Sequence, residues 1–202
     1  MKNINFENKV VLDFGGNFRS LRNLLNNNLV NATNYTCVDV NEHSINLGKE
    51  SNPEATWIHY NRYNPVYNPN GSKNTFPQLN AKYDIIFSYS VFSHTTYEEL
   101  LVFIEYFKTK LNKGGSMYLS VLIHGNPILQ WFYKTRIEQY NECDNILTEP
   151  DEYLYLVNNK IQKNVPHSCK HFLTIYNKQF VSTLGLIESL GLPQTFLKIS
   201  YK

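Results

Sequence analysis

The sequence predicts an α/β fold built on a doubly wound, mostly parallel sheet. Five apolar or alternating runs typical of strands lie before residue 125, and segments with helical spacing separate them. Strands that alternate with helices pair in parallel and are covered on both faces. A chain of 202 residues can bury one sizeable core but not two. We therefore expect one domain over residues 1–202.

The strand-like runs cover residues 10–14, 35–40, 56–60, 83–89 and 116–123. Leu21, Leu24 and Leu25 share one face of a first helix, and a second short helix is predicted over 42–49.

The clearest helix lies in "TTYEELLVFIEYFKTKLNKGG". Thr95 or Thr96 is its predicted cap, and Gly114 and Gly115 are its predicted stop. Its predicted buried stripe is Leu100, Leu101, Ile104 and Phe107.

Three later segments complete the expected topology. Residues 61–80 contain three prolines and no helical period, so we expect a loop there. Residues 124–176 form an irregular insert that we expect to cover the substrate site. An amphipathic helix over 177–190 and a strand over 195–201 are predicted to close the chain.

Composition restricts the classes of partner. The formal net charge is +2, so no strong field attracts nucleic acid or a membrane surface, and we expect neither as a partner. The opening "MKNINFENKV" lacks the apolar core of a signal peptide, and three cysteines form no framework spacing. We expect a cytoplasmic protein, and the oligomeric state stays open.

Charge at the first strand end distinguishes two cofactor classes. The turn reads D-F-G-G-N-F-R, with Asp13 at its entrance and Gly15 and Gly16 adjacent. A dinucleotide places a pyrophosphate here and needs the spaced pattern G-x-G-x-x-G without a nearby acid. S-adenosylmethionine has no phosphate and carries an ammonium and a sulfonium, so it tolerates the acid. The acid favours S-adenosylmethionine.

The second strand ends in "YTCVDVN", which places Asp39 where a carboxylate can accept both hydroxyls of a ribose. The alternative interpretation is that Asp39 caps the helix that begins near Glu42.

With these motifs in view, the chain resembles class I S-adenosylmethionine-dependent methyltransferases, closest to the small-molecule type. "VVLDFGGNFRSLRNLL" resembles the first motif of the family and "YTCVDVN" its ribose acid. "KYDIIFSYSVFSHTTYEELLVFIEYFKTKLNKGGSMYLSV" resembles the fourth and fifth strands with the helix between them. The resemblance covers roughly residues 10–123 and the last strand, and it implies a Rossmann-like methyltransferase fold.

The resemblance also implies cofactor roles for individual residues. The methionine end would contact Asp13, Gly15, Gly16 and the backbone of Ser88, and the ribose would contact Asp39. Val40 would pack on the adenine, and Asn61 stands where the family often has an acid that receives the adenine amino group. From its length and aromatic residues, we also expect the 61–80 loop to cover the adenine through Asn61, Arg62 and Tyr63. Asn17 and Arg19 stand at two customary glycine positions. Asn17 tolerates a positive φ, and we expect Arg19 either to bind the cofactor carboxylate or to point into solvent.

Catalytic candidates are fewer. His94 follows the fourth strand and His124 follows the fifth, so each is a candidate base or an ordinary turn residue. The D/N-P-P-Y/F/W signature of base- and glutamine-modifying enzymes is absent, since "SYSVFSH" stands there. His167 and His171 lack an acidic partner, and we expect no metal site.

The sequence therefore predicts a methyltransferase that uses S-adenosylmethionine and a small-molecule acceptor. The alternative is a non-catalytic cofactor-binding protein or scaffold with the same fold. An NAD-dependent oxidoreductase is disfavoured by Asp13.

Overall fold

The computed structural model describes residues 4–64, 67–72, 75–92, 95, 97–123, 154–157, 160–162, 172–175, 186–187 and 195–200. The chain divides into two compact units. The first comprises residues 1–89, 106–118 and 200–202, and the second comprises 90–105 and 119–199. Helix α3 (Tyr97–Lys108) and strand β5 (Leu111–Ile123) each run from one unit into the other.

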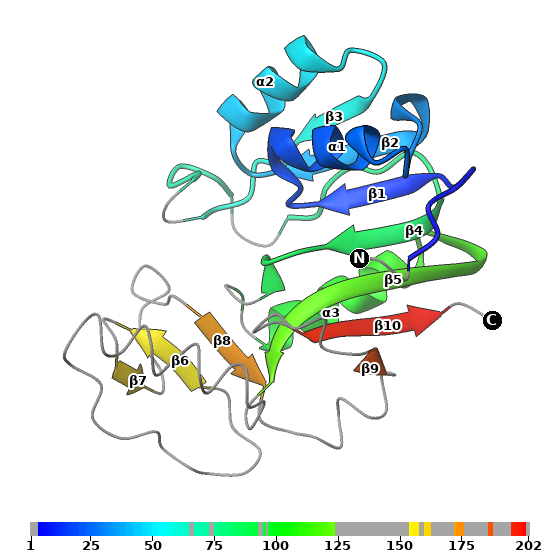
Figure 1. Ribbon diagram of the computed structural model, residues 1–202. Helices are drawn as coiled ribbons and strands as arrows, with labels where there is room; N and C mark the ends of the chain where they lie inside the picture. The colour runs from blue at the N-terminus through cyan, green and yellow to red at the C-terminus, as the bar shows by residue number, and fades with distance from the viewer. Residues whose placement is uncertain are drawn as a thin grey trace. The chain divides into compact units, whose positions relative to one another are not determined.

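The first unit holds the parallel sheet (Figure 1). Its strands are β1 (Val11–Phe14), β2 (Tyr35–Asp39), β3 (Thr56–His59), β4 (Tyr83–Ser88) and the first part of β5, in the order β3-β2-β1-β4-β5. The pairs β1–β2, β2–β3 and β1–β4 are parallel. The strand order reverses direction between β1 and β4. In sheets of this kind, ligands bind outside the carboxyl ends of the strands at such a reversal.

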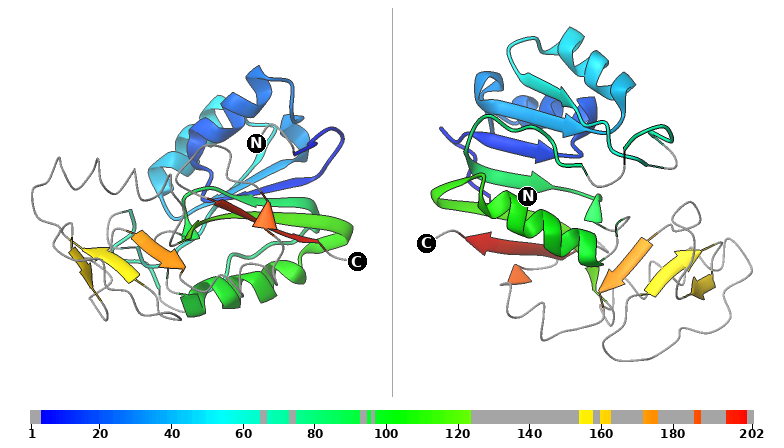
Figure 2. Two further views of the ribbon diagram at one scale, coloured as in Figure 1. Left: turned by 60° about the horizontal axis from the view of Figure 1, so that its bottom comes forward. Right: turned by 180° about the vertical axis from the view of Figure 1, so that it is seen from behind.

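Two helices cover one face of this sheet. α1 (Asn17–Asn26) and α2 (Glu42–Ser51) pack against each other and against β2, and Figure 2 shows them together on one side. A single 3-10 turn, η1 (Ala32–Asn34), leads into β2. In α1, Leu21 and Leu24 are buried, as the helical spacing predicts. Gly48 of α2 lets the Trp57 ring lie against the helix, because a Cβ there would be 2.3 Å from the ring.

Aromatic side chains pack on the face of the sheet opposite α1 and α2. Side chains alternate along a strand, so Phe14 projects away from the face that Asp13 occupies. Its ring packs edge-on against Phe107 at 5.1 Å and lies 6.0 Å from Tyr60. Phe107 is fully buried, and it belongs to the end of α3 that lies in the first unit. The predicted stripe of α3 is confirmed at Leu100, Ile104 and Phe107.

The second unit contains short strands. β6 (Leu154–Val157) pairs antiparallel with β7 (Lys160–Gln162) and with β8 (Phe172–Ile175), and β8 runs parallel to the end of β5. β9 (Leu186–Ile187) pairs antiparallel with β10 (Thr195–Ser200). The final strand was predicted, and its pairing with β9 was not.

Two predictions of secondary structure are wrong. α3 ends at Lys108, and Gly114 and Gly115 lie inside β5 and do not stop the helix. Gly115 packs against the backbone carbonyls of Tyr83 and Asp84, from which a Cβ would be 3.0 Å away. The glycine therefore lets the backbones of β5 and β4 approach closely. The helix predicted over 177–190 fails at Leu186 and Ile187, which form β9, because pairing with β10 overrides the helical spacing.

No helix in the described part of the chain is both long and apolar enough to cross a membrane. The same residues contain no cluster of three or more histidine, cysteine, aspartate or glutamate side chains that could hold a metal ion.

Candidate cofactor site

The turn after β1 has left-handed backbone on both sides of Gly16. Gly15 has φ of +77° and Asn17 has φ of +54°. Asparagine adopts this region more readily than other residues with a Cβ. The expectation that Asn17 can replace a glycine by taking a positive φ is confirmed. The Gly15 N–H donates to the Val38 carbonyl across 2.6 Å, which ties the turn to β2.

Gly16 lies directly over the side chain of Asp13. A Cβ on Gly16 would be 2.2 Å from Asp13 Oδ2, so only glycine leaves room for the carboxyl group. Asp13 is 1% exposed, and its Oδ2 accepts a 2.5 Å hydrogen bond from the Tyr35 hydroxyl. Its Oδ1 has no hydrogen-bond partner among the described residues.

The electrostatics of Asp13 follow from this burial. Desolvation raises the pKa of Asp13 from 3.8 to about 7, against a lowering by the hydroxyls of Tyr35 and Ser20, and the charge of Asp39 raises it further. Asp13 therefore supports the turn from beneath. Direct contact between Asp13 and a cofactor stays a prediction.

Asp39 joins the turns after β1 and β2. Its Oδ2 accepts a hydrogen bond from the Asn17 N–H at 3.0 Å, and its Oδ1 accepts one from the Asn41 N–H at 2.8 Å. The cap of α2 is Asn41, whose side chain accepts from the Ser44 N–H at 3.1 Å, so the alternative helix-capping role for Asp39 is wrong.

Burial and hydrogen bonds have opposite effects on the pKa of Asp39. Desolvation raises the pKa of Asp39, while backbone N–H groups and the charge of His59 lower it. The backbone N–H groups of Asn17, Asn41 and Val40 occupy part of the roughly four acceptor positions of the carboxylate. The Asp39 carboxylate can therefore accept further hydrogen bonds from hydroxyl groups.

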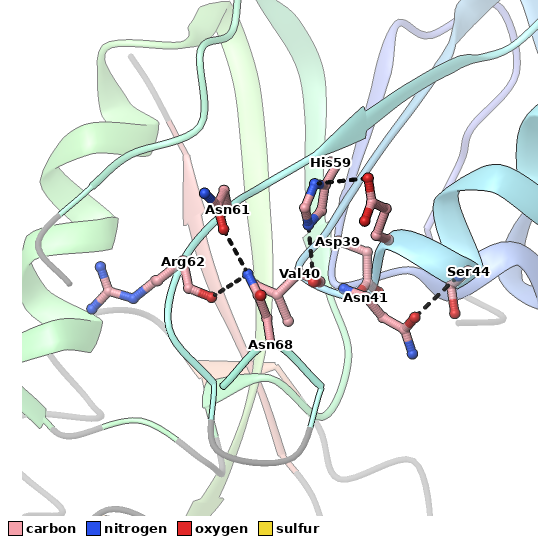
Figure 3. Close-up of polar contacts among 9 residues, drawn as sticks. Asp39, Val40, Asn41, Ser44, His59, Asn61, Arg62 and Asn68 are labelled. Atoms are coloured by element: carbon pink, nitrogen blue, oxygen red, sulfur yellow. Dashed lines mark hydrogen bonds and ion pairs between the residues drawn. The ribbon is translucent and has the colours of Figure 1, made fainter. Parts of the chain in front are cut away.

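His59 lies beside this carboxylate, and the sequence analysis did not select it. It is the register partner of Asp39 across β2 and β3. Its Nε2 lies 3.2 Å from the Val40 carbonyl oxygen (Figure 3), and its Nδ1 lies 4.0 Å from Glu42 Oε1. The available signal was its position at the end of the third predicted strand, level with the acid of the second.

The segment after β3 folds back on itself. The Asn68 side-chain amide donates to Asn61 Oδ1 at 3.0 Å and to the Arg62 carbonyl at 3.1 Å (Figure 3). The Tyr63 N–H donates to the Ser72 carbonyl at 2.9 Å. Gly71 permits this, because a Cβ there would be 2.4 Å from the Arg62 backbone. The predicted loop is confirmed, and the adenine-covering role of these residues stays a prediction.

Ser88 ends β4, next to β1 at the reversal of strand order. It is fully buried, and its Oγ has no hydrogen-bond partner among the described residues. Buried polar atoms are nearly always satisfied. Asp13 Oδ1 and Ser88 Oγ thus place two unsatisfied oxygens at neighbouring strand ends.

The remaining predicted residues divide into two groups. The exposed Arg19 holds its guanidinium 5.3 Å from the centre of the Phe18 ring. Val40 is half-buried in the turn after Asp39. His94 and His124 lie outside the described residues, as does most of the 124–176 insert.

Among the comparisons with known proteins, only the search of solved structures finds similar chains. No protein-family model matches the chain, and no curated protein matches it. Magnesium protoporphyrin IX methyltransferase (ChlM) from Synechocystis PCC 6803, solved with bound SAH, is similar with a TM-score of 0.52 and 13% identity, over 98% of this chain and 76% of that one.

Two further similar structures have lower scores. A methyltransferase from Pyrococcus furiosus has a TM-score of 0.45 at 18% identity, over 69% of this chain and 68% of its own. DesVI from Streptomyces venezuelae has a TM-score of 0.41 at 16% identity, over 57% of this chain. The match spans only 44% of the DesVI chain. The strand order and the similarity to ChlM together show that this chain has the class I methyltransferase fold.

Proposed function

We propose that this protein is an S-adenosylmethionine-dependent methyltransferase that acts on a small-molecule acceptor. The observation that carries the proposal is the Asp39 carboxylate. It is fixed by backbone N–H groups from the turns after β1 and β2, and it keeps acceptor capacity for a ribose. An acid at the end of the second strand of such a sheet is suited to binding ribose hydroxyls.

The residues at the strand ends fit this cofactor. Gly15, Gly16 and Asn17 form a tight turn in which two residues carry no side chain, and the methionine end would lie over it. The buried Asp13 carboxyl group and Ser88 hydroxyl lie at the same reversal of strand order, beside the turn that would receive the methionine end. Asp39 would hold the ribose, and Val40 would pack on the adenine.

When bound, S-adenosylmethionine supplies a methyl group that is already electrophilic. The chain then has to align the acceptor and exclude water. A base is needed only for an acceptor that is protonated or weakly acidic, and His94 and His124 are the proposed candidates. The small-molecule class rests on "SYSVFSH", which replaces the signature of base-modifying enzymes after the fourth strand.

The alternative is a non-catalytic protein that binds the cofactor. Arg19 and Asn17 at customary glycine positions motivate it. Two measurements separate the possibilities. Calorimetry with S-adenosylhomocysteine tests cofactor binding, and transfer of a labelled methyl group to a panel of alcohols, amines and phenols tests catalysis.

Binding with transfer supports the enzyme, and binding without transfer to any acceptor favours the alternative. Absence of binding, or binding of NADH in its place, would contradict both.

A further inference from the structure

We propose that His59 is a positioning residue for cofactor binding: its imidazole anchors the turn after β2 and, when protonated, holds a positive charge beside Asp39. This inference rests on the proposed function, because it assigns His59 a role through the carboxylate that would bind the ribose.

Register places the two side chains on the same face of the sheet. Asp39 and His59 are direct partners in the parallel pair β2–β3, and each is the last residue of its strand. Partners in neighbouring strands project to the same side. The residue after His59 adds a backbone bond, since the Tyr60 N–H donates to the Asp39 carbonyl across 2.8 Å. This bond therefore keeps the ends of β2 and β3 in register.

Each contact of the imidazole needs a proton on the ring nitrogen that makes it. The Val40 carbonyl can only accept, so the Nε2 atom at 3.2 Å must carry a proton. The Glu42 carboxylate also only accepts, so its 4.0 Å approach to Nδ1 is attractive only when that nitrogen is protonated as well. A ring protonated on Nε2 alone satisfies the Val40 contact, and a second proton on Nδ1 would add the attraction to Glu42.

Each residue of the turn after β2 has a separate anchor. Asp39 is held by the N–H groups of Asn17 and Asn41, and Asn41 is held by its cap on α2. Val40 lies between them, and its carbonyl is held by His59 from β3. Removal of the ring would leave the middle of the turn without this anchor.

The His59 ring affects the orientation of the turn and the charge at Asp39 more than it affects the folding stability of the chain. The Glu42 side chain is 71% exposed, and exposed ion pairs contribute little to folding. The charge of His59 nevertheless lowers the pKa of Asp39 against the raising effect of burial. A ribose hydroxyl donates more strongly to a carboxylate than to a neutral carboxyl group.

Other titratable groups share this environment. Glu42 of α2 and Asp39 of β2 face His59, and the charge of Asp39 raises the pKa of Asp13 of β1. Tyr35 and Cys37 of β2 lie near the same carboxylates, and burial raises the pKa of each well above its ordinary value, so both stay neutral. Asp13 titrates near neutral pH itself, and only a comparison of variants that all retain it isolates the effect of His59.

The test uses the full chain with three variants. H59Q keeps a side-chain N–H that can reach the Val40 carbonyl but carries no charge. H59F keeps a flat ring and removes both the donor and the charge. H43Q changes the exposed His43 of α2 and is the matched control.

The first measurement needs no cofactor. NMR titration of the Asp39 carboxyl should give a higher pKa in H59Q than in the wild type, while H43Q matches the wild type. Equal Asp39 pKa values in the wild type and H59Q would overturn the assigned charge effect.

The second measurement is the affinity for S-adenosylhomocysteine at pH 6 and pH 8. At pH 6 we expect H59Q to bind about two- to fivefold more weakly than the wild type, and H59F about tenfold more weakly. At pH 8 we expect H59Q to approach the wild type while H59F stays weaker.

The outcomes distinguish this inference from the proposed function. If the wild type binds and H59Q shows the same affinities at both pH values, the inference is wrong and the proposed function stands. If the wild type does not bind S-adenosylhomocysteine, the proposed function is wrong and His59 has no cofactor to position.

Discussion

The backbone N–H of Asn17 donates to Oδ2 of Asp39 across 3.0 Å and joins the turns that follow β1 and β2. The bond forms because Asn17 adopts a positive φ and Asp39 ends its strand beside it. The position that departs from the customary glycine pattern thus also holds the acid that we expect to bind the ribose.

Replacement of Asp39 should weaken cofactor binding. D39A should lower the binding free energy for S-adenosylmethionine by about 1.5–3 kcal/mol, the range for hydrogen bonds to a charged group. D39N should lower it less, because one acceptor oxygen remains. Calorimetry on both variants measures the difference, with circular dichroism to confirm folding. Unchanged affinity in a folded D39A would remove the ribose assignment.

The buried carboxyl of Asp13 should make stability depend on pH. Its pKa is about 7 in the folded chain against an ordinary 3.8, so the folded state holds this proton more tightly. The resulting stabilisation is complete below pH 3.8 and is lost as the pH rises to 7. At about 1.4 kcal/mol per pKa unit, the loss amounts to roughly 4 kcal/mol.

D13N carries no titrating group and should lack this component. Urea unfolding at pH 4.5, 6 and 7.5 should show wild-type stability falling relative to D13N across the range. Comparison with D13N cancels the opposite trend of the other carboxylates. Parallel stability curves for the two proteins would contradict a raised pKa at Asp13.

Gly16 and Asp13 should show strong energetic coupling. Gly16 has φ of −73°, so alanine suits its backbone and only the contact with the carboxyl group opposes it. G16A should cost about 1–3 kcal/mol in the free energy of unfolding. In a D13A background, which removes the contacted atoms, the same substitution should cost much less. Additive effects in this double-mutant cycle would mean that the steric conflict is elsewhere.

Arg19 offers a test of how the cofactor carboxylate is recognised. Its guanidinium lies in the first turn of α1 over the Phe18 ring, and it is exposed. If it binds the cofactor carboxylate, R19A should weaken S-adenosylmethionine and scarcely affect adenosine, which has no carboxylate. Thermal stability should change little, since a helix-dipole penalty of a few tenths of a kcal/mol opposes a cation–π contact of about 0.5–1 kcal/mol. Equal weakening of both ligands would mean that Arg19 shapes the turn.

The segment after β3 should respond to loss of Asn68. The amide of this side chain bonds to Asn61 and to the Arg62 carbonyl, so N68A should loosen the loop. Limited proteolysis should cut N68A within 61–80 faster than the wild type, and S-adenosylhomocysteine should slow cleavage of both. Cleavage that is insensitive to S-adenosylhomocysteine would argue against a role in covering the adenine.

The sequence predicts the parallel sheet well because its strands are locally distinct. Runs such as 35–40 and 83–89 are apolar, and β2 and β4 follow them closely. Gly114 and Gly115 misled the prediction, because a glycine pair reads the same at a helix end and at a close approach inside a strand. Leu186 and Ile187 pair with β10, a partner that helical spacing cannot reveal.

The site was predictable where one residue carries its own signal. Asp39 ends a strand and Asn17 stands at a customary glycine position, so the sequence alone selects both residues, and their cofactor roles stay predictions. His59 was missed because its role depends on register with Asp39, which only the paired strands define. The charge argument about Asp13 needs revision as well, since a carboxyl with a pKa of about 7 beneath Gly16 repels a phosphate less than a fully ionised one does.

The most direct measurement is a crystal structure of the chain with S-adenosylhomocysteine. The account predicts that the ribose hydroxyls lie within hydrogen-bond distance of the Asp39 carboxylate, with the methionine end over Gly15 and Gly16. A ligand bound with its ribose away from Asp39, or at a different edge of the sheet, would contradict the proposed site.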